Sequence, residues 1–288
     1  MRSVKSSLPA VLVALGACQA APEHPTTLDM TTWSVAAIDP ATGDVGVAAA
    51  SCVPSFADAL AALVPGKGAA ATQAGFDVAN RNVVYAALQE GLTAEEIIER
   101  VTDPAVDSMT DRRQYGVVTV NDGAVHVAGF TTPTRLGTTG EPEPTRWAGV
   151  MADPRWGVTV QGNTLVDERV VADGLEAFRW DDPTGFNTLA DRLLRALEAG
   201  SVAGGDVRCN DATTRQTAAM AFIVVARGSD PPYATESIGM SDQGTDAAPW
   251  LAISVRGERG GDNPLLELRL RYDRWRREAG PQPSMTIR

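Results

Sequence analysis

The chain has 288 residues, of which 44% are hydrophobic and 21% charged, and its formal net charge is −11. This length and composition indicate a folded protein with one large domain or two small ones, and they exclude disorder over most of the chain. The negative charge argues against binding to nucleic acid phosphates or to an anionic membrane surface, because both need a cationic field. We therefore expect a small, neutral or cationic partner and no nucleic acid.

The first residues have the pattern of an export signal. Basic residues precede the apolar run 8–17, which is too short to span a bilayer as a permanent helix. Small residues directly before Cys18 resemble a bacterial lipobox, so we expect a signal peptide over 1–17 and lipidation of Cys18, with an ordinary cleaved signal as the alternative. Residues 18–31 are expected to form a tether. The predicted location is the cell envelope or periplasm, with the lipid as the only membrane contact.

Export determines how the remaining cysteines are interpreted. With Cys18 lipidated, Cys52 and Cys209 remain, and such a pair in an oxidising compartment is expected to form a disulfide. Two buried thiols are the alternative. Zinc is not expected, because the mature chain holds only His24 and His126 and no cysteine pair at ligand spacing. No other metal or cofactor is expected either.

The hydrophobic pattern switches repeatedly between strand and helix periods along the chain. Strands are predicted at 32–38, 45–51, 68–73, 115–120, 124–129, 157–162, 218–226 and 250–255. Helices are predicted at 83–101, 167–178, 189–199 and 263–277. The first of these helices should break near Gly91 and restart with Thr93 as its cap.

The order of these elements indicates the fold class. Turn residues at 39–44 and the Asn-Asp-Gly sequence at 121–123 predict hairpins. Strands that pair first as hairpins, with helices following, favour an α+β sandwich with antiparallel sheets between helices over a doubly wound parallel sheet. We expect one domain over 32–277 and a loose tail over 278–288.

Familiar catalytic motifs are missing from the sequence. A serine triad needs a histidine base, and His126 lies on a predicted strand, where a packed or surface role is expected. The sequence has no nucleophile elbow, phosphate loop or dinucleotide fingerprint. Polar residues at the ends of predicted strands stand out instead: Thr72, Gln73, Gln161, Asn163 and Gln216. They either satisfy core backbone groups or line a site, and the sequence supports both interpretations equally.

Several short segments, in order over about residues 32–226, carry a resemblance to a known family. They are Thr32-Trp33-Ser34-Val35-Ala36, Val45-Gly46-Val47-Ala48, Ala71-Thr72-Gln73-Ala74, Arg113-Gln114-Tyr115-Gly116-Val117, Trp147-Ala148-Gly149, Val160-Gln161-Gly162-Asn163 and Gly204-Gly205-Asp206. Together they resemble a bacterial family known only as domain of unknown function ten-twenty-eight. The resemblance implies an N-terminal-nucleophile hydrolase-like fold, a four-layer α-β-β-α sandwich, but no known reaction. Cys52 and Cys209 also resemble cysteines of exported members, which supports the disulfide.

The resemblance implies a mechanism that needs no histidine. In enzymes of this fold a Thr, Ser or Cys begins the first strand, and cleavage of the chain frees its amine as the general base. A free α-amine has a pKa of about 8, so it can accept a proton near neutral pH. Thr32 occupies the corresponding strand start, and the bond to be cut is Thr31–Thr32 or, failing that, Met30–Thr31. Without cleavage, Thr32 is an ordinary β-branched residue that opens a strand.

A candidate site follows from this mechanism. Thr32 would attack the carbonyl, and Asn163 or backbone N–H groups near Gly75 would stabilise the oxyanion. Lys67, the only lysine after the leader, would lower the proton affinity of the nucleophile, with an exposed turn lysine as the alternative. The residues expected to orient substrate are Ser51, Gln73, Arg113 and Gln161.

The resulting hypothesis is an amide hydrolase that acts on a small or peptide-like substrate. A non-catalytic envelope lipoprotein that binds a ligand in the same cleft is the main alternative, and a structural envelope protein is a weaker one. Side-chain alternation predicts that Thr32 and Ser34 share one face and Trp33 takes the other. Lys67, or else Gln73 and Asn163, should then lie close to the Thr32 hydroxyl, beside open volume. The oligomeric state stays open, with a homo-oligomer among the candidates.

Overall fold

The structure is a computed structural model of the whole chain. It describes residues 28–30, 32–54, 57–132, 135–136, 142–143, 149–234 and 249–278. The predicted signal peptide, Cys18, most of the predicted tether and residues 279–288 lie outside the described residues. In the described ranges, no helix is both long enough and apolar enough to cross a membrane.

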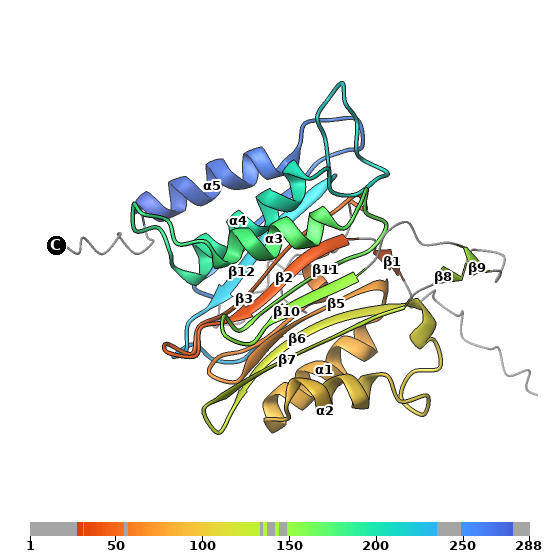
Figure 1. Cartoon of the computed structure of the whole chain (residues 1–288), viewed down its shortest axis with the longest axis vertical. Coiled ribbons are helices and arrows are strands. Elements are labelled where there is room, and N and C mark those ends of the chain that lie inside the picture. Colours follow the sequence, from red (N-terminus) through yellow and green to blue (C-terminus); the bar gives the residue numbers. More distant parts are fainter. Residues whose placement is uncertain are drawn as a thin grey trace, which may run out of the picture.

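Two antiparallel six-stranded sheets lie face to face at the centre of the molecule (Figure 1). The first sheet has the order β13-β4-β5-β6-β7, with β1 paired to β5. Its strands are β1 (Leu28–Met30), β4 (Ala61–Val64), β5 (Gly68–Phe76), β6 (Arg113–Asn121), β7 (Ala124–Thr131) and β13 (Tyr233–Ala234). The second sheet has the order β10-β11-β2-β3-β12-β14. Its strands are β2 (Thr32–Ile38), β3 (Val45–Ser51), β10 (Gly149–Asp153), β11 (Val158–Gly162), β12 (Met220–Ala226) and β14 (Leu251–Arg256). A small separate pair joins β8 (Arg135–Leu136) to β9 (Pro142–Glu143).

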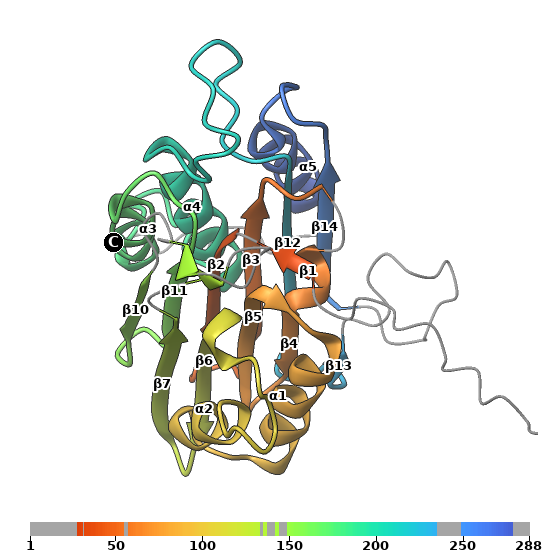
Figure 2. The ribbon, with the colours of Figure 1, turned by 90° about the vertical axis from the view of Figure 1, so that its right-hand side faces the viewer.

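Helices cover the outer faces of both sheets (Figures 1 and 2). The described residues form five α-helices: α1 (Val78–Glu90), α2 (Ala94–Val101), α3 (Arg169–Arg179), α4 (Leu189–Val202) and α5 (Pro264–Glu278). The first two pack on the first sheet, and the other three on the second. The predicted α+β class with antiparallel sheets is therefore confirmed.

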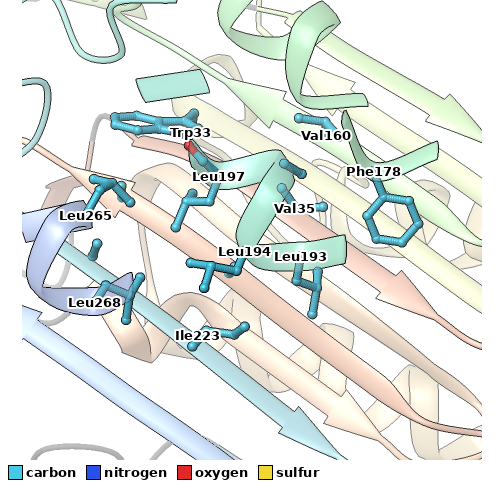
Figure 3. Close-up of a cluster of buried hydrophobic side chains, with 14 of the residues drawn as sticks. Trp33, Val35, Val160, Phe178, Leu193, Leu194, Leu197, Ile223, Leu265 and Leu268 are labelled. Carbon is cyan, nitrogen blue, oxygen red and sulfur yellow. Dashed lines mark hydrogen bonds between the residues drawn. The ribbon is translucent and has the colours of Figure 1, made fainter. Parts of the chain in front are cut away.

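Three buried apolar clusters hold these layers together. Leucines of α4 and α5 pack with Trp33 and Ile223 on the outer face of the second sheet (Figure 3). The cluster between the two sheets is rich in small residues such as Ala49 and Ala71, so the sheets can approach closely. Helices α1 and α2 cover the outer face of the first sheet. Burying these side chains is the main favourable term in folding, at about 25 cal/mol per Å² of apolar surface.

The predicted break in the first helix is confirmed by its capping residues. Gly91 adopts φ 80°, the left-handed conformation that ends α1. Thr93 and Glu96 form a capping box that starts α2. The first helix begins five residues earlier than predicted, because the Asp77 side chain accepts a hydrogen bond from the Ala79 N–H and caps the helix there.

Residues 28–30 do not form a tether as predicted but strand β1 on the first sheet. Strands β4 and β10 were also missed. Two of the four residues of β4 are alanine, which has no strand preference of its own, and burial in the sheet decides their conformation. In β10, Met151 and Ala152 are exposed neighbours, so the strand lacks the strict alternation on which the sequence prediction depends.

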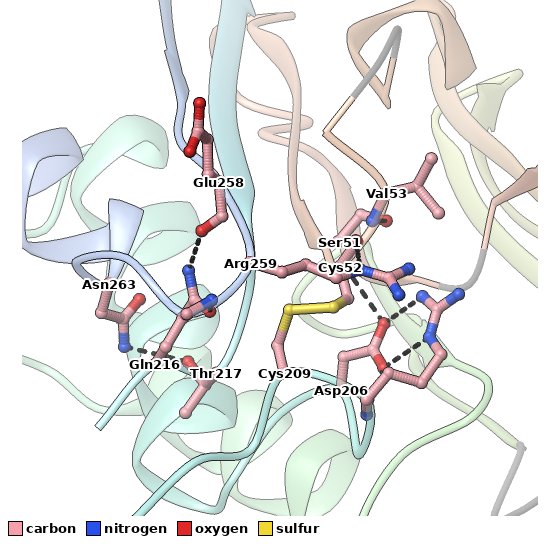
Figure 4. Close-up of a disulfide and its surroundings, with 12 residues drawn as sticks. Ser51, Cys52, Val53, Asp206, Cys209, Gln216, Thr217, Glu258, Arg259 and Asn263 are labelled. Carbon is pink, nitrogen blue, oxygen red and sulfur yellow. Dashed lines mark hydrogen bonds and ion pairs between the residues drawn. A yellow bond between two sulfur atoms is a disulfide. The ribbon is translucent and has the colours of Figure 1, made fainter. Parts of the chain in front are cut away.

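The predicted disulfide between Cys52 and Cys209 is confirmed, with 5.7 Å between their Cα atoms (Figure 4). It joins the end of β3 to the loop after α4. The carboxylate of Asp206, in the same loop, accepts hydrogen bonds from the Cys52 N–H at 3.2 Å and from the Arg208 side chain. Arg259 donates to the Cys52 carbonyl at 3.0 Å. This end of β3, next to Ser51, is therefore fixed covalently and by charged hydrogen bonds.

Candidate functional site

Thr32 opens β2 with its side chain directed toward the first sheet. The next residue, Trp33, points the other way and donates from Nε1 to the Leu197 carbonyl of α4 at 3.1 Å. Ser34 points toward the first sheet and donates to Gln73 Oε1 at 2.6 Å. Side chains alternate along a strand, so Thr32 shares the face of Ser34. The predicted alternation of Trp33 and Ser34 is confirmed.

The backbone of Thr32 is held from two sides. Its carbonyl accepts hydrogen bonds from Gln73 Nε2 at 3.0 Å and from the Asn163 N–H at 3.2 Å. Its partner in the β2–β3 register is Ser51. The structure thus brings together five of the predicted site residues, Thr32, Ser51, Gln73, Gln161 and Asn163.

Thr32 has 0% of its surface exposed, so the expectation of an exposed hydroxyl is wrong for the uncleaved chain. Two cavities formed by described residues lie elsewhere. One, of about 320 Å³, is lined by Ile38, Trp156 and Phe178 at the far end of β2. The other, of about 450 Å³, lies between β14 and α5 beside Trp275.

An amide cluster joins the two sheets beside Thr32. Its members are Ser34, Gln73, Gln114, Gln161 and Asn163, all of them buried. Gln114 Oε1 accepts from Gln73 Nε2 at 2.7 Å and from Asn163 Nδ2 at 3.0 Å. Gln161 Nε2 donates to Ser34 Oγ at 2.7 Å. The cluster therefore links β2 and β11 of the second sheet to β5 and β6 of the first.

The amide cluster can position groups but cannot take up a proton at neutral pH. Its members are neutral amides and one hydroxyl, none of which is a useful base. In the uncleaved chain, the Asn163 side chain donates to Gln114 Oε1. A base for Thr32 must come from outside the cluster or from the freed amine of Thr32 itself.

Sequence reasoning missed Gln114 and Gly116 as members of this site. A Cβ built at Gly116 would lie 1.9 Å from Gln161 Oε1, so only glycine lets this amide approach β6. Gln161 Oε1 and Thr159 Oγ1 are buried there with no hydrogen-bond partner among the residues that the structure describes. Period-two alternation from the outward-facing Tyr115 was the signal that could have placed both residues inward.

Two strained residues directly follow members of the amide cluster. Ala74, after Gln73, has φ 69°, and Thr164, after Asn163, has φ 57°. Residues other than glycine rarely adopt this left-handed region, and a β-branched residue such as threonine does so at a clear cost. Such strain concentrates where the surrounding structure imposes a special backbone path, which indicates a functional site here.

Arg113 lies on the opposite face of the first sheet, so the prediction that it orients substrate beside Thr32 is wrong. Its guanidinium donates to Asp107 at 2.7 and 3.1 Å and to the Gly75 carbonyl, and it lies 3.6 Å from Asp77. Burial alone would raise the pKa of Asp107, but hydrogen bonds from Arg113 and from the Met109 N–H outweigh it, so this pKa lies below its ordinary value.

Lys67 also lies away from Thr32. It is exposed in the turn between β4 and β5, and its Nζ donates to the Gln89 carbonyl near the end of α1. Six residues of strand separate it from Gln73, which corresponds to roughly 20 Å. The expectation that Lys67 approaches the Thr32 hydroxyl is therefore wrong, and the turn lysine that the sequence left as the alternative is what the structure shows.

His126 lies on β7, with Nδ1 3.4 Å from Glu95 Oε2. It is partly exposed at the outer side of the first sheet, as expected for a surface strand residue. In the ranges that the structure describes, no group of three or more His, Cys, Asp or Glu residues could hold a metal ion.

The chain ahead of Thr32 lies on the other sheet. The backbone of β1 pairs antiparallel with the end of β5, with Leu28 opposite Phe76, Asp29 opposite Gly75 and Met30 opposite Ala74. Thr32 then begins β2 in the second sheet. Between Met30 on the first sheet and Thr32 on the second, the chain thus passes from one sheet to the other, and Thr32 lies next to the amide cluster.

Comparison with known proteins places this architecture in a family. The model of the family of unknown function DUF1028 matches residues 32–258, so the chain belongs to this family. Among solved structures, protein SPO2555 from Silicibacter pomeroyi, described as DUF1028, is similar with a TM-score of 0.61 and 23% identity, over 90% of this chain and 98% of that chain. No match was found among curated proteins. At this identity, the structural likeness concerns the fold alone.

Proposed function

We propose that this member of DUF1028 is an N-terminal-nucleophile hydrolase that cleaves an amide bond and is activated by cleavage before Thr32. The order of layers, helices then two sheets then helices, is that of the four-layer sandwich of such enzymes. The observation that carries the proposal is the position of Thr32. It opens a central strand, faces the opposite sheet and has its carbonyl fixed by Gln73 and Asn163.

The chemistry requires the free amine of Thr32. The amine takes the hydroxyl proton, Oγ attacks the substrate carbonyl, and the leaving amine departs with the proton. Water then hydrolyses the resulting ester. Gln73 and Asn163 act as positioning residues, because they fix the carbonyl of Thr32 and with it the start of the strand. Backbone N–H groups near Gly75, or Asn163 after release from Gln114, are proposed to stabilise the oxyanion.

The remaining predicted residues have less direct roles in this proposal. Ser51, opposite Thr32, and Gln161, which holds Ser34, are proposed to shape the substrate cleft once the chain is cut. Lys67 has no role in this proposal because its Nζ donates to the Gln89 carbonyl near the end of α1. Arg113, which donates to Asp107 and to the Gly75 carbonyl, does not contact the nucleophile in this proposal.

Export and anchoring belong to the same proposal. We propose lipidation of Cys18, so that cleavage before Thr32 leaves the lipid on residues 18–31 and releases the domain from the membrane. A Cys18→Ala variant should then lose membrane association before cleavage.

A non-catalytic ligand-binding role remains the second candidate, and one observation favours it. In the uncleaved chain Thr32 is fully buried and the donors around it are hydrogen-bonded to one another. If the chain is never cut, the nitrogen of Thr32 stays in a peptide bond and cannot act as the base, and the domain would then bind a ligand without turnover.

N-terminal sequencing and intact mass of the exported protein test the proposal. We expect a species that begins at Thr32, with Thr32→Ala staying uncut and Thr32→Ser still being processed. Thr32→Ala should also abolish turnover in a screen of N-acyl amides, while costing only about 1 kcal/mol of stability. Thr42→Ala, in the exposed turn after β2, is the matched control and should change neither the cleavage before Thr32 nor the turnover. An active protein that retains the residues ahead of Thr32 would contradict the proposal.

A further inference from the structure

Strand β1 occupies a place on β5 that other strands leave open. Pairing of β4 with β5 ends at Ala71, and pairing of β6 with β5 ends at Ala74. Residues Ala74 to Phe76 extend past the end of β4, and the backbone of β1 pairs with them there. This segment of β5 is therefore a strand-binding slot, which we define as the backbone of Ala74–Phe76 on the side taken by β1.

The slot is held rigid by groups outside β1. Arg113 donates to the Gly75 carbonyl, and its guanidinium is fixed in turn by Asp107. Asp77, which follows the slot directly, caps α1 through the Ala79 N–H at 2.8 Å. Phe76 is buried in the core between the sheets. These contacts do not depend on β1, so the slot should persist when β1 leaves.

The path of the chain couples the slot to Thr32. One residue, Thr31, separates Met30 in the slot from Thr32 at the start of β2. An extended chain that fills the slot in the direction of β1 therefore brings the carbonyl of its following residue, which corresponds to Thr31, close to Thr32.

We infer that the acyl half of the substrate is an extended, peptide-like chain that adds to β5 in this slot as β1 does. The inference rests on the proposed function and specifies its substrate class. Main-chain hydrogen bonds would supply the affinity, as in other cases of strand addition. Acyl groups without backbone amides, such as acetyl, lack these bonds and should be poor substrates.

Cleavage of the chain itself would form an ester on the same Thr32 hydroxyl as turnover does, although the free amine that serves as base in turnover exists only after this first step. Thr32 Oγ bonds to the carbonyl carbon of Thr31, the bond from that carbon to the Thr32 nitrogen breaks, and the hydroxyl proton goes to the freed amine. Water attacks the ester, so Thr31 leaves as a carboxylic acid and Oγ regains a proton. The released segment is the first product, and it should inhibit by refilling the slot.

The test uses processed protein purified from the full chain, with two fluorogenic amides that share one leaving group. One carries the tetrapeptide of residues 28–31 as its acyl part, and the other carries acetyl-threonine. We expect kcat/KM to be roughly tenfold or more higher for the tetrapeptide, because it can form backbone hydrogen bonds in the slot. A scrambled tetrapeptide that keeps threonine last is the control for side-chain effects and should retain most of the advantage.

N-methylation of the tetrapeptide provides a readout that only strand pairing produces. In an antiparallel pair, successive residues alternate between facing the partner and facing away. A peptide methylated at the position of residue 29 should therefore differ in kcat/KM from peptides methylated at positions 28 or 30. Methylation of an N–H that faces β5 should lower kcat/KM roughly tenfold. The free tetrapeptide acid should compete with the substrate.

The possible outcomes distinguish a failure of the strand-binding slot from a failure of the proposed hydrolase function. Equal turnover of both amides, or equal effects of methylation at all three positions, would overturn the slot while leaving the hydrolase intact. A chain that is never cut before Thr32 keeps β1 in the slot and would overturn both.

Discussion

At the scale of single residues, the strained backbone of Ala74 is the feature closest to the proposed chemistry. Ala74 has φ 69° and stands between Gln73 and Gly75. Gln73 donates a hydrogen bond to the Thr32 carbonyl, and the Gly75 carbonyl accepts one from Arg113. An alanine in this conformation costs about 1 kcal/mol relative to glycine. The surrounding contacts must therefore hold Ala74 in this unfavourable conformation.

Ala74→Gly is expected to raise the free energy of unfolding by about 0.5–1 kcal/mol, because glycine adopts positive φ without a clash. Urea denaturation measures this change. Turnover should fall in the same variant, since a looser backbone no longer fixes the slot and Gln73.

Ala71→Gly in the same strand is the matched control. Ala71 is buried between the sheets without positive φ, so this change should destabilise the protein. Equal destabilisation by both substitutions would show that Ala74 carries no relievable strain.

Residue-scale prediction from the sequence succeeded where strand alternation decides the outcome. Trp33 and Ser34 take opposite faces as predicted, because only period two is needed to place them. Lys67 was misplaced because a turn residue's neighbours depend on how β5 packs, which local pattern does not encode. Gln114 was missed because some of its partners, such as Gly162 and Asn163, come from the other sheet.

At the scale of elements, the two sheets approach each other closely where β6 faces β11. Gly116 leaves room for Gln161, whose Nε2 donates to Ser34 on β2. A methyl group at Gly116 must displace the Gln161 amide and break that hydrogen bond. The contact is tight because Thr159 Oγ1 also lies 2.8 Å from the same built Cβ.

Gly116→Ala is expected to lower the free energy of unfolding by about 2–3 kcal/mol, through the clash and the lost buried hydrogen bond. Gln161→Ala should cost about 2 kcal/mol by leaving Ser34 without its donor. The double variant should lose less stability than the two single variants lose together. With alanine at position 161, the methyl group at position 116 no longer clashes with the glutamine side chain. Chemical denaturation of all four forms gives this double-mutant cycle, and strict additivity would contradict the contact.

Element prediction was reliable for segments with strong periodicity and clear caps. The β2–β3 hairpin, the α1–α2 break and the terminal helix follow from local pattern. Strand β1 could not be predicted, since three residues in a threonine- and proline-rich stretch become a strand only because the end of β5 offers an unpaired edge. The same edge defines the proposed slot.

At the scale of the whole molecule, buried charge on the first sheet makes stability depend on pH. Asp107 accepts hydrogen bonds from Arg113 and from Asn80 Nδ2 at 2.6 Å, behind the sheet that carries the amide cluster. Burial opposes ionisation of Asp107, but its hydrogen bonds more than offset this, so its pKa in the folded protein is lower than in the unfolded chain. As the pH falls, Asp107 is therefore protonated at a higher pH in the unfolded state than in the folded state.

The sign of the effect follows by linkage. A carboxylate with a depressed folded pKa contributes stability above its unfolded pKa of about 3.9, and that contribution is lost as pH falls through the folded pKa. Asp107→Asn should therefore cost about 3 kcal/mol at pH about 7, where it leaves the Arg113 charge without its main partner. The difference between the two proteins should shrink progressively below pH about 4, as Asp107 of the unvaried protein is protonated.

Urea denaturation of both proteins across this pH range measures the difference. Asp173→Asn, at an exposed position on α3, is the control and should leave a small, nearly constant difference. Because Arg113 also holds the Gly75 carbonyl, Asp107→Asn should weaken the slot as well, and tetrapeptide turnover should fall more than acetyl-threonine turnover. A stability gap that stays constant down to pH about 2 would show that the Asp107–Arg113 pair does not set the acid limit of the fold.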